Sequence, residues 1–170
     1  CTLDALIQCA DTAMHRVKAH GRGNFRFYQP QMNVDLLSRM KMDHAMRQAM
    51  ELNRFRLHYQ PQISLWDGRL LGVEALVRWC DPELGNVPPS SFIPLAEESG
   101  FIIAIGNWVM AEAVRQAVVW QQAGRPVVIS VNVSALQFQQ TDFVDRVANT
   151  LQTAGLDPAL MARAVPGTFC

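Results

Sequence analysis

The first fifty residues show two helical patterns separated by a short segment with strand periodicity. Apolar residues repeat at helical spacing from Leu3 to Ala19, and Gly21 stands where a left-handed residue would end such a helix. Residues 24–30, "NFRFYQP", alternate aromatic and polar positions, which predicts a short strand. A second helical pattern covers residues 34–53 and predicts a helix that joins two regions of the chain.

A β-hairpin is predicted next. Residues 54–60, "RFRLHYQ", place an apolar or aromatic side chain at every second position. The pair Asp67 and Gly68 then supplies a turn before a second alternating stretch from Leu70 to Trp79. The four tryptophans, at 66, 79, 108 and 120, are interpreted as residues of the hydrophobic core.

Helices and one further strand are predicted after the hairpin. A loop over residues 80–90 precedes Ser91, which we interpret as the cap of a short helix, and a long helix follows over residues 105–123. Residues 127–133, "VVISVNV", are apolar enough for a strand buried on both faces. A last helix is capped by Ser134 and ends at Gly155. This order of strands and helices predicts an α/β fold. Both a barrel and an open sheet are compatible with it.

Composition and charge narrow the function. Of the 170 residues, 49% are hydrophobic, enough for a sizeable core, and the 15 basic residues balance the 15 acidic ones. A neutral chain lacks the broad attraction that DNA, RNA or an anionic membrane requires, so we expect none of these as partners of this segment. The four cysteines are scattered without a zinc pattern, which favours reduced thiols and a cytoplasmic location.

Two charges on a strand that otherwise belongs to the core are the main functional signal. Glu74 and Arg78 fall on the strand face that also carries Leu76. Glu74 could form a salt bridge with Arg78, could reach solvent at a strand end, or could bind a metal or substrate. Asn132 lies near the end of another strand. Carboxylate and amide oxygens from neighbouring strand ends could share Mg²⁺ or Mn²⁺, with Arg78 placed for a phosphate.

Three stretches in order resemble the first half of an EAL domain, a family of cyclic di-GMP phosphodiesterases. They are "YQPQISLWDGRLLGVEALVRW", "FIPLAEESGFI" and "ISVNVSALQF". The resemblance implies a TIM-like barrel with its first strand reversed and two divalent cations at the strand ends. It also implies a metal-activated water that attacks one phosphodiester of cyclic di-GMP to give linear pGpG.

The resemblance implies roles for five residues of this chain. Glu74 and Asn132 match the family's metal ligands, and Arg78, Gln60 and Leu76 match residues that face the nucleotide. No catalytic residue is assigned, because the lysine that assists the water in the family would lie beyond this chain. A homodimer through this domain is also expected.

Residues 1–30 carry a second resemblance, through "ADTAMHRVKAHGRGNFRFY", to the end of a GGDEF (diguanylate cyclase) domain. We therefore expect a GGDEF remnant over residues 1–30, a linker over 31–41 and the first half of an EAL domain over 42–170.

The third glutamate of the EAL family has no counterpart in "LMARAVPGTFC". We expect a fragment of a bacterial GGDEF–EAL signalling protein, inactive alone, with a possible upstream membrane tether. The alternatives are a non-catalytic cyclic di-GMP receptor or scaffold, and an incomplete sheet without activity.

Overall fold

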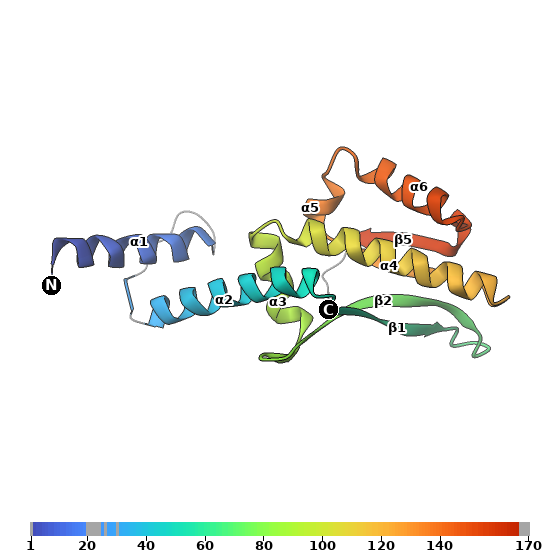
Figure 1. Ribbon diagram of the computed structural model, residues 1–170, viewed down its shortest axis with the longest axis horizontal. Coiled ribbons are helices and arrows are strands. Elements are labelled where there is room, and N and C mark those ends of the chain that lie inside the picture. The colour runs from blue at the N-terminus through green and yellow to red at the C-terminus, as the bar shows by residue number, and fades with distance from the viewer. Residues whose placement is uncertain (1, 20–24, 26, 30, 167–170) are drawn as a thin grey trace. The chain divides into compact units, whose positions relative to one another are not determined.

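The computed structural model of the chain describes residues 2–19, 25, 27–29 and 31–166 (Figure 1). It divides into two compact units, Cys1–Met46 and Arg47–Cys170. The boundary falls inside one helix, α2, which spans Gln31–Glu51. The predicted linker over residues 31–41 therefore lies within a helix, and the domain limits themselves stay predictions.

The first unit contains helix α1 and the start of α2. Helix α1 spans Leu3–Ala19, as predicted from its apolar spacing. The strand predicted over residues 24–30 is wrong for the described part of that segment, since Phe25 and 27–29 form no strand. A strand needs a partner for its backbone hydrogen bonds, and the described part of this unit offers none. Positions 24, 26 and 30 of that prediction, and the predicted helix end at Gly21, lie outside the described residues.

The second unit is built on a sheet with strand order β1-β2-β4-β5, and the short strand β3 pairs with β2. The pairs β1/β2 and β2/β3 are antiparallel, whereas β2/β4 and β4/β5 are parallel. The predicted hairpin is therefore confirmed, and the first strand, β1, runs antiparallel to β2 at the edge of the sheet, as expected from the EAL resemblance. The strands are β1 Phe55–Ile63, β2 Leu70–Asp81, β3 Gly85–Val87, β4 Ile129–Val133 and β5 Met161–Pro166.

Strands β3 and β5 are additions to the predicted order. Strand β3 has three residues and lies inside the predicted loop over residues 80–90, where Gly85 adopts a positive φ of 69°. Such a short pairing has no alternation by which the sequence could reveal it. Strand β5 pairs with β4 in the segment where the family's third glutamate has no counterpart. The chain therefore continues the sheet there, in residues that contain no carboxylate.

The helices follow the predicted order, except that the single helix predicted between Ser134 and Gly155 is divided into α5 and α6, and that η1 was not predicted. They are α3 Pro89–Glu98, α4 Ile102–Gln122, α5 Ala135–Phe138, α6 Phe143–Ala154 and the 3₁₀ helix η1 Pro158–Leu160. Ser91 is not a helix cap: α3 begins at Pro89, because the fixed φ of proline suits the first helical turn. Ser134 does cap α5, since its hydroxyl accepts the Gln137 N–H at 3.2 Å. Helix α6 ends at Gly155 with φ 66°, as predicted.

The core of the second unit lies between the sheet and helix α4, which crosses it in Figure 1 and contacts β1, β2 and β4. Trp79 is buried and packs against the rings of Phe55 and Phe92, with centroid distances of 5.8 and 5.6 Å. Trp66 is 99% exposed at the hairpin turn, so the prediction that it belongs to the core is wrong. Residues in a two-strand turn extend past the sheet and the helix that covers it.

Helix α4 is long and apolar enough to meet a membrane-span criterion based on length and composition alone. Core helices of globular domains meet the same criterion. In the second unit α4 also packs against α3, α5 and α6 and buries residues along its whole length, from Ile102 to Ala117. Packing within the unit therefore accounts for its apolar character.

Gly72 permits the close approach of β2 to the chain leading into β4. A Cβ there would lie 2.7 Å from the carbonyl oxygen of Val128, which accepts the Val73 N–H at 2.8 Å. Because that oxygen belongs to the backbone, Gly72→Ala would separate the two strands. We expect a loss of about 1–3 kcal/mol in the free energy of unfolding, measured in urea. The exposed neighbour variant Leu71→Ala should change it by under about 0.5 kcal/mol; equal stabilities would contradict this packing.

Asp81 fixes the end of β2. Its carboxylate accepts bonds from Arg54 Nη1 at 2.9 Å and from the backbone N–H groups of Glu83 and Leu84 at 3.0 and 3.3 Å. Burial alone would raise the pKa of Asp81, but these donors outweigh it and hold the pKa below its usual value. The ionised form therefore stabilises the fold at neutral pH, and that contribution is lost as the pH falls through the folded-state pKa.

We accordingly expect Asp81→Asn to lower the free energy of unfolding by about 1–3 kcal/mol at neutral pH, because it breaks the buried bond to Arg54. The difference from the wild type should shrink as the pH falls below about 4, because the unfolded carboxyl takes up its proton there while the folded one, with its lower pKa, is still ionised. Urea unfolding at several pH values measures both quantities. A difference that stays constant down to the lowest pH would show that the charge of Asp81 is not the cause.

Candidate metal and phosphate site

The polar face of β2 carries the candidate residues. Glu74, Leu76 and Arg78 are half-buried on one face, while Val73 and Ala75 are buried on the other. This follows from the two-residue period of a strand, which sends alternate side chains to opposite faces. The two charges are therefore kept out of the core that β2 forms with α4.

Glu74 and Asn132 meet across the parallel pair β2 and β4. The strands pair with Glu74 opposite Ser130, which places Asn132 two residues further along β4 and on the same face. The Asn132 side-chain amide Nδ2 donates to Glu74 Oε1 at 2.7 Å. The structure therefore brings together the carboxylate and the amide that the sequence analysis expected to converge. Their role as metal ligands stays a prediction.

The salt bridge that could have explained Glu74 is absent from the described residues. Instead, Arg78 Nη1 donates to the backbone carbonyl of Val77 at 2.8 Å, and Glu74 is bonded to Asn132. No acidic side chain forms an ion pair with Arg78 in the described part of the chain. The guanidinium is thus held by the backbone, and its remaining N–H groups can serve a ligand.

The other two predicted residues lie beside this pair. Gln60 of β1 is the direct cross-strand partner of Glu74 and is exposed to solvent. Leu76 and Arg78 line, together with Asn132, a small cavity of about 10 Å³, which has room for about one water. All five predicted residues therefore belong to one region of the sheet, at the junction of β1, β2 and β4.

Arg56 is a neighbour of this region that the sequence analysis did not consider. It is exposed and lies directly opposite Arg78 in the antiparallel pairing, and it donates to the carbonyl of Phe55 at 2.8 Å. Arginines at directly opposed positions of two strands favour an anionic ligand. The sequence could have indicated that Arg56 lies opposite Arg78. The turn at Asp67 and Gly68, together with the alternation along the two strands, specifies the register of the hairpin.

Tyr59, next to Gln60 in β1, faces the opposite side of the sheet. Burial, reinforced by the Glu112 carboxylate and opposed by Arg115, raises the pKa of Tyr59 to about 12. Its ring packs edge-on against Trp120 at a centroid distance of 5.0 Å. Tyr59 therefore keeps its proton at neutral pH and serves the core, not the polar face.

The donor set at the polar face fits part of a hard-cation site. Mg²⁺ prefers oxygen ligands and is commonly held by one or two carboxylates, with water and phosphate oxygens completing the shell. Glu74 supplies a carboxylate as one metal ligand. Because Asn132 bonds to Glu74 through Nδ2, its side-chain oxygen Oδ1 can serve as a second metal ligand. No cluster of three or more His, Cys, Asp or Glu side chains occurs among the described residues. These two oxygens are therefore only the beginning of a metal site.

The chain is similar in sequence to curated bacterial proteins. The chain is 42% identical over 151 residues to the bifunctional diguanylate cyclase/cyclic di-GMP phosphodiesterase MucR of Pseudomonas aeruginosa, covering 88% of this chain and 22% of that protein. It is 40% identical over 148 residues to the cyclic di-GMP phosphodiesterase PdeR of Escherichia coli, covering 87% and 22%. The chain thus spans about a fifth of the length of these curated relatives.

A solved structure gives the same fold. The chain superposes on the phosphodiesterase of MucR in its c-di-GMP complex with a TM-score of 0.69 and 43% identity, covering 71% of this chain and 49% of that one. The EAL domain pattern matches residues 43–165, which include strands β1 to β4, all of β5 except Pro166, and all five candidate residues. The chain belongs to the EAL domain family.

Proposed function

We propose that residues 43–165 supply the first metal-binding and nucleotide-binding residues of a cyclic di-GMP phosphodiesterase. The observation that carries this proposal is the 2.7 Å bond between Glu74 and Asn132, which places two oxygen-bearing side chains from separate strands on one face. The similarity to the phosphodiesterases MucR and PdeR supports the substrate class.

In this proposal Glu74 and Asn132 hold Mg²⁺ or Mn²⁺ through oxygen atoms, which both ions prefer. When bound, divalent cations lower the pKa of water and neutralise charge on phosphate oxygens. Arg78 binds a phosphate of cyclic di-GMP with the N–H groups that the Val77 carbonyl leaves free. In the same proposal, Gln60 and Leu76 face the nucleotide beside the Arg78 guanidinium.

Turnover in this proposal belongs to a longer protein and not to these 170 residues. The described residues contribute one carboxylate and one amide, and the sequence of β5, "MARAVP", adds no acid on the strand next to Asn132. A tight two-metal site needs more ligands than this. We therefore expect the 170-residue chain alone to lack phosphodiesterase activity.

The second candidate function is that of a non-catalytic cyclic di-GMP receptor or scaffold. The observation that favours it is the same acid-free β5, because a domain that only binds the dinucleotide has no use for a complete metal site. In that case Arg78, Gln60 and Leu76 would keep their roles, and the bond between Asn132 and Glu74 would simply satisfy two polar groups.

One experiment separates the two candidates. The full-length protein is incubated with cyclic di-GMP and Mg²⁺ or Mn²⁺, with and without EDTA, and linear pGpG is measured by chromatography. We expect hydrolysis that EDTA removes. Binding of the dinucleotide without hydrolysis would support the receptor, and the absence of both binding and hydrolysis would contradict both functions.

A further inference from the structure

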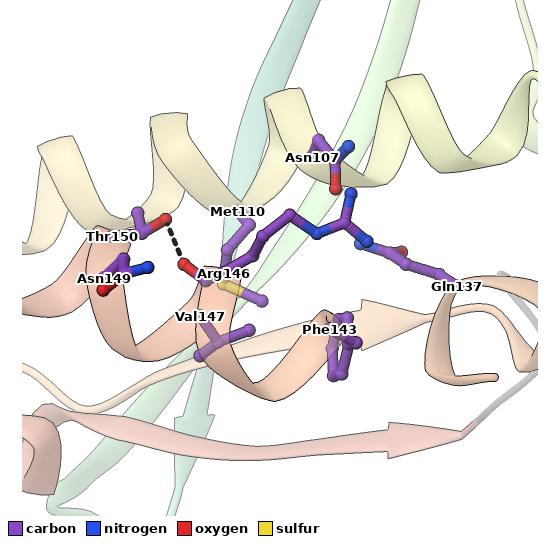
Figure 2. Close-up of a pocket in the computed structure, with 8 residues that line it drawn as sticks. All are labelled: Asn107, Met110, Gln137, Phe143, Arg146, Val147, Asn149 and Thr150. Atoms are coloured by element: carbon purple, nitrogen blue, oxygen red, sulfur yellow. Dashed lines mark hydrogen bonds between the residues drawn. The ribbon is translucent and has the colours of Figure 1, made fainter. Parts of the chain in front are cut away.

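A second hollow lies outside the polar face of the sheet, between helices α4, α5 and α6. Its volume is about 310 Å³, near the lower end of the range for small-molecule sites. Figure 2 shows side chains from all three helices around it, among them Asn107 of α4, Gln137 of α5 and Arg146 of α6. None of the five candidate residues of the polar face lines this hollow.

Gln137 lines the hollow with a buried amide, whose oxygen lies against Gly106 of α4. The residue is only 2% exposed, and its side-chain oxygen Oε1 has no hydrogen-bond partner. The amide lies so close to Gly106 that a Cβ at that glycine would overlap it, so helix α4 limits where the amide can move. A buried acceptor without a partner costs about 1–3 kcal/mol, which a ligand that donates a hydrogen bond would recover.

Arg146 presents unpaired donor capacity to the same hollow. Its Nε and Nη2 are both buried and have no hydrogen-bond partner, although Nε lies within ion-pair distance, 3.3 Å, of Asp142 Oδ2. Thr150 Oγ1 donates to the Arg146 carbonyl at 2.7 Å, one turn along α6. Figure 2 shows the guanidinium extended along the hollow toward Asn107 and Gln137. Nε and Nη2 form the same edge of the guanidinium, so this edge keeps unused donors beside the Asp142 carboxylate and at the hollow.

The remaining walls limit the kind of ligand. Met110, Phe143 and Val147 give the hollow an apolar side. A guanidinium edge is best matched by the two oxygens of a carboxylate or phosphate, which it binds with parallel charge-assisted hydrogen bonds. We propose that this hollow binds a small organic anion, with its carboxylate or phosphate on Arg146, a hydrogen-bond donor on Gln137 and a short apolar body against Met110, Phe143 and Val147.

The proposal does not depend on the phosphodiesterase function, because no residue of the hollow belongs to the polar face. The two regions are nevertheless joined by the chain: Asn132 lies two residues before Ser134, the cap of α5, and α5 carries Gln137. A ligand that binds Gln137 therefore contacts the helix that directly follows the strand of Asn132.

Isothermal titration of the full-length protein with two probes tests the site. Inorganic phosphate reports on a phosphate group, and butyrate reports on a carboxylate with a short apolar body. At about 10 mM either probe would saturate a millimolar site. We expect binding of at least one of them, weakened at least tenfold in Arg146→Met. The matched variant Arg125→Met, which changes an exposed arginine, should bind as the wild type does.

Gln137→Glu provides a second variant that keeps the size of the side chain. A carboxylate at this position would pair with Arg146 inside the hollow, so anion binding should disappear while the melting temperature rises. This result does not depend on whether Arg146→Met folds. Absence of binding by both probes, or binding that Arg146→Met and Gln137→Glu leave unchanged, would overturn the proposal. The stronger of the two probes identifies the head group.

Discussion

Replacing Glu74 with alanine in the full-length protein is expected to lower metal-dependent hydrolysis of cyclic di-GMP at least about 100-fold. Even residues that only support a metal ligand cost about 10- to 100-fold when they are changed, and Glu74 is proposed to bind the ion itself. The change also leaves the Asn132 amide without the acceptor that it contacts at 2.7 Å. Initial rates of pGpG formation at saturating Mn²⁺ measure the effect.

The matched control is Glu83→Ala. Glu83 is an exposed acid in the turn after β2, so its loss removes one negative charge without touching the polar face. Its rate should stay within about twofold of the wild type, since surface changes of this kind have small effects. Circular dichroism should show that both variants fold. A Glu74→Ala variant that turns over at the rate of Glu83→Ala would remove Glu74 from the metal site.

Replacing Trp79 with alanine is expected to cause the largest loss of stability, about 3–5 kcal/mol in the free energy of unfolding. Trp79 is 1% exposed and packs against Phe55 and Phe92, on the face of β2 opposite to Glu74. Removing the indole would leave a cavity in the layer that joins β1, β2 and α3. Urea unfolding followed by circular dichroism measures the loss.

Two companion variants make the Trp79 result specific. Trp66→Ala changes a tryptophan that is 99% exposed and should alter the free energy of unfolding by under about 0.5 kcal/mol. Trp79→Phe should cost less than Trp79→Ala, because it keeps a ring and removes an indole N–H that has no hydrogen-bond partner. Equal losses for Trp79→Ala and Trp66→Ala would contradict the burial on which this core depends.

The parts of the fold that the sequence predicted are those with a long repeating pattern. The alternation on either side of the Asp67 and Gly68 turn specified the hairpin, and Ser134 and Gly155 marked helix ends through their own backbone chemistry. The predictions that failed are those in which the local sequence pattern disagrees with the surroundings of the segment in the fold. Residues 24–30 alternate like a strand but have no partner strand among the described residues of their unit, and Trp66 is apolar but lies in a turn.

The part of the candidate site that could be predicted from the sequence is the strand face on which each residue lies. Period two put Glu74 and Arg78 on one face, and the parallel pairing brought Asn132 to it. The position of Arg56 opposite Arg78 depends on the hairpin register, which the sequence analysis did not derive residue by residue. The hollow beside Arg146 is formed by three separate helices that pack together in the fold, and no local spacing could reveal it.

The metal role of the polar face is tested most directly by Mn²⁺ affinity, measured by electron paramagnetic resonance on the full-length wild type, Glu74→Ala, Asn132→Ala and the double variant. If both side chains bind the same ion, each single variant should bind Mn²⁺ more weakly than the wild type. The double variant should then bind only slightly more weakly than whichever single variant has the lower affinity. This corresponds to a coupling energy of about 1 kcal/mol or more between the two positions. Unchanged Mn²⁺ affinity in both single variants, or losses that simply add, would contradict a shared cation at Glu74 and Asn132.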